Sequence, residues 1–249
     1  MSDPLTLSQL LRRRLVFISG KGGVGKSTAA ITLGLLCAQQ KKRTLIIEMN
    51  SMGRVAPVFS TEYHNHNEIA LDTMLSGINL HPKLCFEEFV MDRLKFGRLY
   101  KIIFNNKYVA NFLDAIPGLN EILMLGRIHD LEKKQVGSLR REAKYDMIIV
   151  DAPATGHGLS ALEVPNVLMK AVKVGPLAKY AKDILELLKN EEHTAFSLVT
   201  LAEEMPVQES YEYVQKLLKH SSIAIGPILI NAVMPEIEKN KIEKSKDQD

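Results

Sequence analysis

Residues 20–28 read Gly20-Lys21-Gly22-Gly23-Val24-Gly25-Lys26-Ser27-Thr28, and this stretch decides the fold. It fits the pattern G-x-x-x-x-G-K-S/T, follows an apolar run from Leu15 to Ser19 that is typical of a strand, and begins a run that is typical of a helix. A glycine-rich loop in this context points successive backbone N–H groups at one anion, and the helix N-terminus behind it adds partial positive charge. The stretch therefore predicts a phosphate loop within an α/β fold.

The predicted ligand of this loop is a nucleoside triphosphate, ATP, held together with Mg²⁺. We expect Lys26 to reach the β- and γ-phosphates and the Ser27 hydroxyl to be a ligand of Mg²⁺. The residues expected to bind the nucleotide in this loop are Gly20, Gly22, Gly23, Val24, Gly25, Lys26, Ser27 and Thr28. The alternative is a glycine-rich turn with an incidental lysine, which the agreement of strand, spacing and helix disfavours.

A second polar segment follows another buried strand. The apolar run Tyr145–Val150 leads directly into Asp151, which is the Walker B pattern of a carboxylate that holds Mg²⁺ directly or through water. The alternative role for Asp151 is to cap a following helix. The next residues form a short loop able to turn and to sense the γ-phosphate, and we expect the switch residues to include Pro153, Thr155, Gly156 and His157.

Composition limits the class of protein. The chain has 249 residues, of which 46% are hydrophobic, and a net charge of +3, so it can bury a full core and gives no indication of nucleic-acid binding. Its two cysteines, Cys37 and Cys85, cannot form a disulfide framework. No secretory signal or membrane-length apolar run is present, so we expect a cytoplasmic protein without stable membrane insertion.

The hydrophobic pattern predicts a mostly parallel sheet flanked by helices, with an inserted helical subdomain. Residues 1–59 and 143–235 are assigned to the nucleotide-binding core, residues 60–142 to a helical insertion without strands, and residues 236–249 to a charged tail. Helices around residues 160–190 are candidates to join the insertion. Its apolar residues recur at spacings of three and four, as at Phe86, Phe89 and Val90. They form either the insertion's own core or part of an apolar binding groove.

Lys21 carries a resemblance to a known group of ATPases. It follows the first glycine of the loop, and Gly20–Thr28 resembles the signature-lysine Walker A of the group that contains MinD, ParA, the nitrogenase iron protein and ArsA. In that group two nucleotide sites face each other, and this lysine reaches the phosphates of the partner chain. The resemblance implies that Lys21 is catalytic and acts as an arginine finger would. The alternative is a solvated loop lysine.

Further motifs narrow the resemblance to the ArsA-type ATPases. Asp151-x-Pro153-x-Thr155-Gly156-His157 is similar to the switch II segment of the arsenical pump-driving and guided-entry ATPases. Residues 117–123 and 199–207 also resemble that family, over a match that runs from about residue 14 to residue 235. The resemblance implies that Asn231 recognises adenine, for which an amide offers both a donor and an acceptor.

One catalytic position departs from the family. The resemblance places the switch I aspartate, which positions or deprotonates the attacking water, at Asn50. An amide can accept a hydrogen bond from water but cannot take its proton, so we expect slow hydrolysis. Three explanations stay open: Glu48 supplies the carboxylate, the chain pairs with a more active subunit, or Asn50 is an engineered replacement of aspartate.

The sequence therefore predicts an ATP hydrolase that works as a nucleotide-switched dimer. Its partner is a second copy or a related ArsA-like subunit, and its helical subdomain binds a hydrophobic helix or membrane-protein client. The alternatives are the motor subunit of an anion pump, a regulatory switch like MinD or ParA, and a nucleotide-binding subunit deficient in hydrolysis. An arsenite pump is disfavoured because As(III) requires several thiolates together.

Overall fold

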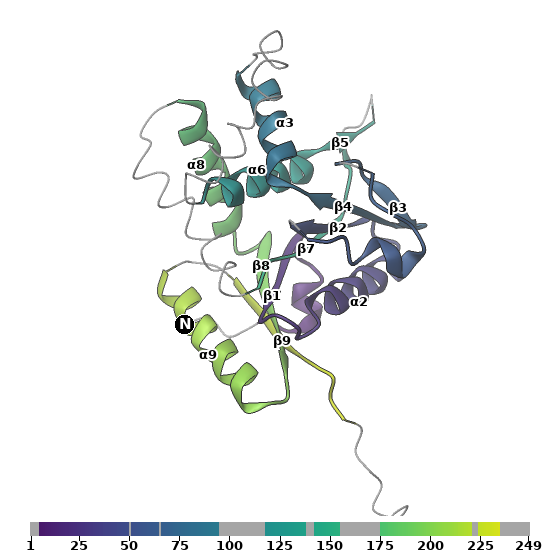
Figure 1. The fold of residues 1–249 in the computed structure, drawn as a ribbon, viewed down its shortest axis with the longest axis vertical. Coiled ribbons are helices and arrows are strands. Elements are labelled where there is room, and N and C mark those ends of the chain that lie inside the picture. Colours follow the sequence, from purple (N-terminus) through teal and green to yellow (C-terminus); the bar gives the residue numbers. More distant parts are fainter. Residues whose placement is uncertain are drawn as a thin grey trace, which may run out of the picture.

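A single large sheet forms the centre of the molecule. The computed structural model describes residues 5–49, 51–64, 66–94, 118–137, 142–154, 175–220 and 224–234. Seven strands pair in the order β3-β4-β2-β7-β1-β8-β9, and only the β3–β4 pair is antiparallel (Figure 1). In chain order the strands are β1 (Leu15–Gly20), β2 (Thr44–Met49), β3 (Ile69–Asp72), β4 (Leu75–Leu80), β7 (Met147–Asp151), β8 (Thr194–Leu201) and β9 (Ala224–Asn231). The predicted mostly parallel sheet is confirmed.

Helices cover both faces of this sheet (Figure 1). They are α1 (Leu7–Leu10), α2 (Lys26–Gln39), η1 (Ala56–Phe59), α3 (Pro82–Leu94), α6 (Leu119–Lys133), α8 (Pro176–Lys189) and α9 (Glu204–His220). One apolar core joins α1 and α2 to one face of the sheet through residues such as Leu10 and Leu33. The other joins α3, α6, α8 and α9 to the opposite face through residues such as Phe89, Ile122 and Ile184. The sequence-based fold class is therefore confirmed.

The central strands form because their sequences are continuous apolar runs. All residues of β1, β2 and β7 are buried, as expected for parallel strands covered on both faces. The strands β2 and β7 pair in parallel so that Glu48 lies beside Asp151, and β1 lies on the other side of β7 with Ile18 beside Asp151. The carboxyl ends of these three strands therefore meet at one edge, where open α/β sheets bind ligands.

The prediction that residues 60–142 contain no strands is wrong for residues 69–80. These residues form β3 and β4, and β4 pairs in parallel with β2 inside the main sheet. Gly77 and Asn79 interrupt the apolar run of β4, so its sequence does not stand out as a strand. Burial beside β2 decides the outcome, because the Asn79 amide is buried and donates to the Ser51 carbonyl oxygen at 3.0 Å. A small antiparallel pair, β5 (Gln135–Val136) with β6 (Glu142–Ala143), follows α6.

The helical part of the predicted insertion is represented by α3 and α6. Their apolar residues Phe89, Val90, Ile122 and Leu123 are buried in the core shared with the sheet, so these side chains are core rather than groove. Residues 95–117, residues 155–174 and the charged tail lie outside the described residues. None of the helices within the described ranges has the length and apolarity needed to cross a bilayer.

Candidate functional site

The loop between β1 and α2 requires glycine where its backbone approaches other segments. Gly25 has φ of 92°, and a Cβ added there would lie 2.1 Å from Nδ2 of Asn231. A Cβ at Gly20 would lie 2.4 Å from the carbonyl oxygen of Val199 on β8. Both positions therefore exclude a side chain, and the loop closes tightly over the N-terminus of α2.

Asn231 supports this loop from the end of β9. Its Nδ2 donates a hydrogen bond to the Val24 carbonyl oxygen at 2.9 Å, and Val24 itself is buried. The structure thus places Asn231 against the backbone of residues 24 and 25. The contact it makes is with the loop backbone, and adenine recognition stays a prediction.

Lys26 lies at the first position of α2, half buried. Its Nζ donates to the Lys21 carbonyl oxygen at 2.9 Å, so the side chain folds back over the loop. Burial lowers the pKa of the Lys26 ammonium, the Asp151 carboxylate opposes this shift, and the positive charge of Arg54 adds to it. An ammonium held at this place faces the space where a loop of this kind holds phosphates.

Ser27 and Asp151 come together as predicted for a magnesium site. The Ser27 hydroxyl donates to Oδ2 of Asp151 at 2.5 Å, although the two residues are far apart in the chain. Asp151 is buried at the end of β7. Burial raises the pKa of this carboxyl, the Ser27 hydrogen bond opposes the shift, and the neighbouring Glu48 adds to it. A hydroxyl and a carboxylate are hard oxygen donors, so this pair fits Mg²⁺.

The structure offers no richer metal site at this position. Among the described residues, no group of three or more His, Cys, Asp or Glu side chains could hold a metal ion. Ser27 and Asp151 would therefore share the ion with the phosphates of the nucleotide, which is how Mg²⁺ is held in phosphate-loop ATPases.

Glu48 organises the segment that follows β2. Its carboxylate is fully buried and accepts hydrogen bonds from the Ser51 hydroxyl at 2.6 Å, the Arg54 N–H at 2.8 Å and the Val55 N–H at 3.1 Å. Glu48 thus shapes the loop after β2 through both of its oxygens. Asn50 lies outside the described residues, as do the predicted switch residues Thr155, Gly156 and His157.

The side chain of Lys21 contacts α9. Its Nζ donates to Oε1 of Glu209 on α9 at 2.6 Å, and both side chains are partly exposed. Lys26 lines the cavity described next, whereas Lys21 is not among the described residues that do so. The two lysines of the loop therefore face different surroundings.

A cavity of about 870 Å³ adjoins the loop, large enough for a nucleotide. Its walls come from three parts of the chain: the phosphate loop with α2, the segments after β2 and β7, and α6. The lining residues include Gly22, Gly23, Gly25, Lys26, Ser27, Thr28, Arg54, Asn120, Glu121, Met124, Asp151 and Pro153. Sequence reasoning missed Arg54, Asn120 and Met124. The family-like motif at residues 117–123 was the available signal for α6, but it did not indicate contact with the nucleotide cavity.

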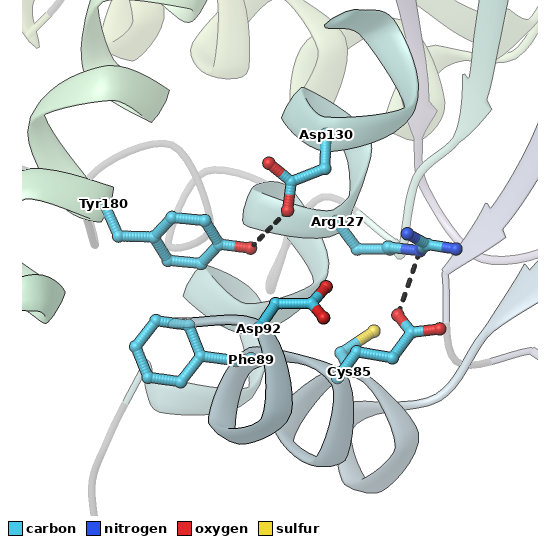
Figure 2. A pocket seen from close by; sticks show the side chains of 7 residues that line it. Cys85, Phe89, Asp92, Arg127, Asp130 and Tyr180 are labelled. Atoms are coloured by element: carbon cyan, nitrogen blue, oxygen red, sulfur yellow. Dashed lines mark hydrogen bonds and ion pairs between the residues drawn. The ribbon is translucent and has the colours of Figure 1, made fainter. Parts of the chain in front are cut away.

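Helix α6 contacts the other helices of its layer at a second, smaller pocket (Figure 2). Arg127 of α6 forms an ion pair with Glu88 of α3 at 3.0 Å, and the Tyr180 hydroxyl of α8 donates to Asp130 at 3.3 Å. Gly126 lets the Tyr180 ring approach the helix, because a Cβ there would lie 2.0 Å from the ring. Helix α6 therefore contacts both α3 and α8.

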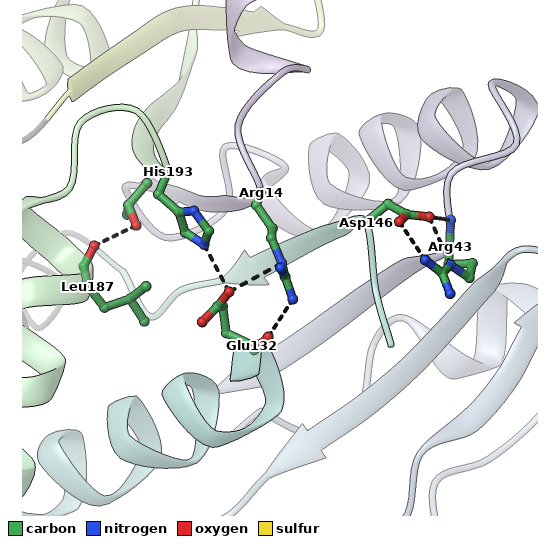
Figure 3. Close-up of polar contacts among 7 residues, drawn as sticks. Arg14, Arg43, Glu132, Asp146, Leu187 and His193 are labelled. Atoms are coloured by element: carbon green, nitrogen blue, oxygen red, sulfur yellow. Dashed lines mark hydrogen bonds and ion pairs between the residues drawn. The ribbon is translucent and has the colours of Figure 1, made fainter. Parts of the chain in front are cut away.

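The far end of α6 is fixed to the sheet (Figure 3). The buried Glu132 carboxylate accepts from His193 Nε2 at 2.9 Å and pairs with Arg14 Nε at 3.2 Å, while Arg14 also donates to the Glu132 carbonyl oxygen at 2.5 Å. Burial alone would raise the pKa of Glu132, but His193 and Arg14 outweigh it and the pKa is lowered. Glu132 therefore ties one end of α6 to the start of β1.

The two cysteines lie in different cores. Cys37 belongs to the core beneath α2, and Cys85 belongs to the core on the opposite face of the sheet. Burial raises the pKa of both thiols, so neither favours the thiolate form. This chain alone cannot bring them together to bind a soft ion such as As(III).

Comparison with known proteins shows to which family this chain belongs. The family model described as anion-transporting ATPase matches residues 13–179 and 176–249. ATPase BagA of Mycobacterium tuberculosis is 28% identical over 92% of this chain and 67% of its own length. A protein of Aquifex aeolicus named as an arsenical pump-driving ATPase is 27% identical over 94% of this chain and 84% of its length. An ATPase ASNA1 homolog of Plasmodium berghei is 22% identical, over 92% and 66%. Since the family model spans nearly the whole chain, the chain belongs to the ArsA-type, anion-transporting ATPase family.

Proposed function

We propose that this chain is a nucleotide-switched ATPase that works as a dimer with a second copy of itself or with a related subunit. The observation that carries the proposal is that the two lysines of the phosphate loop make different contacts. Lys26 lines the chain's own cavity, while Lys21 lies on its α9 side, paired with Glu209. A lysine held there is available to reach a site on a neighbouring chain.

The residues of one chain supply most of the proposed ATP site. The loop amides and Lys26 would hold the phosphates, and Ser27 and Asp151 would hold Mg²⁺, which when bound neutralises phosphate charge. Glu48 keeps the segment after β2 in place beside Asp151. Lys21 of the partner chain would then place its ammonium beside the phosphoryl group and stabilise the negative charge of this group during transfer.

The response to nucleotide would pass through α6. Its N-terminal residues Asn120, Glu121 and Met124 line the cavity, its middle contacts α3 and α8, and Glu132 anchors its other end. Binding or hydrolysis of ATP can thus shift the helical layer that we propose holds a hydrophobic helix as client. This proposal divides the chain into the nucleotide-binding core, a helical insertion within residues 60–142 and the charged tail. Strands β3 and β4 are assigned to the core, because they belong to the main sheet.

The dependence of ATPase rate on protein concentration tests the proposed dimer. If two chains form one active unit, the rate per chain rises with protein concentration until dimers predominate. The proposal would be contradicted if the ATPase rate per chain stayed constant from nanomolar to micromolar protein while the protein was shown to be monomeric.

Glu209→Gln is expected to favour the dimer. The substitution removes the carboxylate that holds Lys21, and an exposed pair of this kind contributes little, so the ATP-dependent dimer dissociation constant should fall about 2- to 5-fold. Sedimentation measures the constant, and Glu212→Gln on the same helix is the matched control. A weaker dimer in Glu209→Gln would mean that this ion pair supports association rather than opposing it.

A second candidate is a nucleotide-binding subunit deficient in hydrolysis, which Asn50 favours. Asn50→Asp is expected to raise the single-turnover rate of ATP hydrolysis, because a carboxylate can accept the proton of the attacking water and an amide cannot. Rapid-quench measurement with protein in excess reports this rate. An unchanged rate would remove the assignment of residue 50 to the switch I position.

A further inference from the structure

Arg54 adds a cation to the wall of the cavity that adjoins the phosphate loop. It belongs to the segment after β2, and it lines the same cavity as Lys26, Ser27 and Asp151. Its side chain is exposed, so the guanidinium is free to meet a solute that enters the cavity. The positive charge of Arg54 is not explained by the phosphate-loop pattern, the Walker B pattern or the predicted switch segments.

The backbone at Arg54 is hydrogen-bonded to the buried carboxylate of Glu48. Oε1 of Glu48 accepts the Arg54 N–H at 2.8 Å and the Ser51 hydroxyl at 2.6 Å, and the Gly53 N–H donates to the same hydroxyl at 3.0 Å. Glu48 is fully buried within β2, so this anchor belongs to the sheet rather than to the surface. The side chain of Arg54 therefore starts from a fixed point on the cavity rim.

Arg54 shares the lining of this cavity with the two groups at its phosphate end. These are the Lys26 ammonium of the loop and the Asp151 carboxylate of β7. A polyanion bound in the cavity would therefore be attracted by the Arg54 guanidinium as well as by the loop lysine.

We propose that Arg54 binds the terminal phosphate of ATP held by its own chain. The loop amides would cradle the inner phosphates, so the outermost phosphate would lie nearest to Ser27, Asp151 and the segment after β2. A guanidinium presents a planar set of donors that matches two phosphate oxygens, and it cannot lose its proton at ordinary pH. Arg54 therefore makes the site prefer a triphosphate over a diphosphate. The proposal deepens the proposed function, since it names a further residue that binds substrate at that site.

Equilibrium binding of two nucleotides to Arg54→Ala tests this proposal. With a fluorescent ADP and a fluorescent non-hydrolysable ATP, we expect the dissociation constant for the triphosphate to rise about 10- to 100-fold, as loss of a charge-assisted phosphate contact implies. The constant for ADP should change less than about 2-fold. Arg54→Lys should keep part of the preference, because an ammonium retains the charge but not the paired donors.

Arg12→Ala is the matched control, since Arg12 is an exposed arginine that does not line the cavity. Unchanged triphosphate binding in Arg54→Ala, or an equal loss for ADP and triphosphate, would overturn the proposal. Melting curves of each variant show that the fold is retained. Because the contact is made within one chain, the effect should persist in a Lys21→Ala background. The effect of Arg54→Ala on nucleotide binding would therefore be expected even if the protein did not form the proposed dimer.

Discussion

Lys26→Ala is expected to reduce ATP turnover by about 100-fold or more and to weaken ATP binding. The ammonium of Lys26 stands over the loop, donates to the Lys21 carbonyl and lines the cavity. Alanine leaves the phosphates without the loop lysine that lines the cavity, and Lys21 is not among the described residues that line it. Steady-state phosphate release and nucleotide titration measure the two effects.

Lys182→Ala is the matched control for Lys26→Ala. Lys182 is exposed on α8, where it pairs weakly with Glu186 at 3.7 Å, so its removal should leave turnover and binding unchanged. If Lys26→Ala retained the turnover of the wild type, the phosphate loop would not be the site of ATP hydrolysis.

Asp151→Asn is expected to reduce Mg²⁺-dependent hydrolysis by a factor of about 100 to 1,000 while the fold is kept. The amide oxygen can still accept the hydrogen bond of Ser27, which in the wild type is 2.5 Å long. The substitution removes a negative charge that Mg²⁺ would use. Hydrolysis measured over a range of Mg²⁺ concentrations separates loss of metal affinity from loss of the chemical step.

The stability of Asp151→Asn gives an independent check on the same carboxyl. Burial raises its pKa in the folded chain, with Glu48 adding to the shift, so ionising Asp151 costs stability once the pH exceeds the pKa of the unfolded chain. Asparagine has no such cost, and its melting temperature at neutral pH should equal or exceed that of the wild type. Asp146→Asn is the control, because Asp146 pairs with Arg43 at 2.8 Å (Figure 3) and its pKa is lowered. Full activity in Asp151→Asn would contradict the magnesium assignment.

The core strands could be predicted because their sequences carry the signal locally. The runs in β1, β2 and β7 are apolar throughout, and each ends at the edge where the site forms. The strand β4 could not be predicted in this way. Its polar residue Asn79 is buried, and the Ser51 carbonyl oxygen, 28 residues away in the chain, accepts a hydrogen bond from its amide.

The candidate site likewise contains features that the local sequence predicts and contacts that it does not predict. The spacing within residues 20–28 is enough to predict the phosphate loop, and the Ser27–Asp151 pair follows from the topology of β1 and β7. The pairing of Lys21 with Glu209 and the support of Val24 by Asn231 join residues at opposite ends of the chain. No local pattern encodes such contacts, since they depend on how β8, α9 and β9 pack.

Arg54 illustrates a different limit. Its sequence neighbours show no binding motif, and its position on the cavity wall depends on the buried carboxylate of Glu48. Sequence reasoning treated Glu48 as a candidate catalytic group. The structure shows that both its oxygens accept hydrogen bonds from the loop that carries Arg54.

The mass of the protein in solution, measured with and without a non-hydrolysable ATP analogue and Mg²⁺, tests the central claim most directly. The protein should be purified from its own source so that a related subunit is retained. We predict a mass of two chains with the analogue, one chain without it, and one chain under both conditions for Lys21→Ala. A wild-type protein that binds the analogue yet stays a single chain, with no partner, would contradict the account.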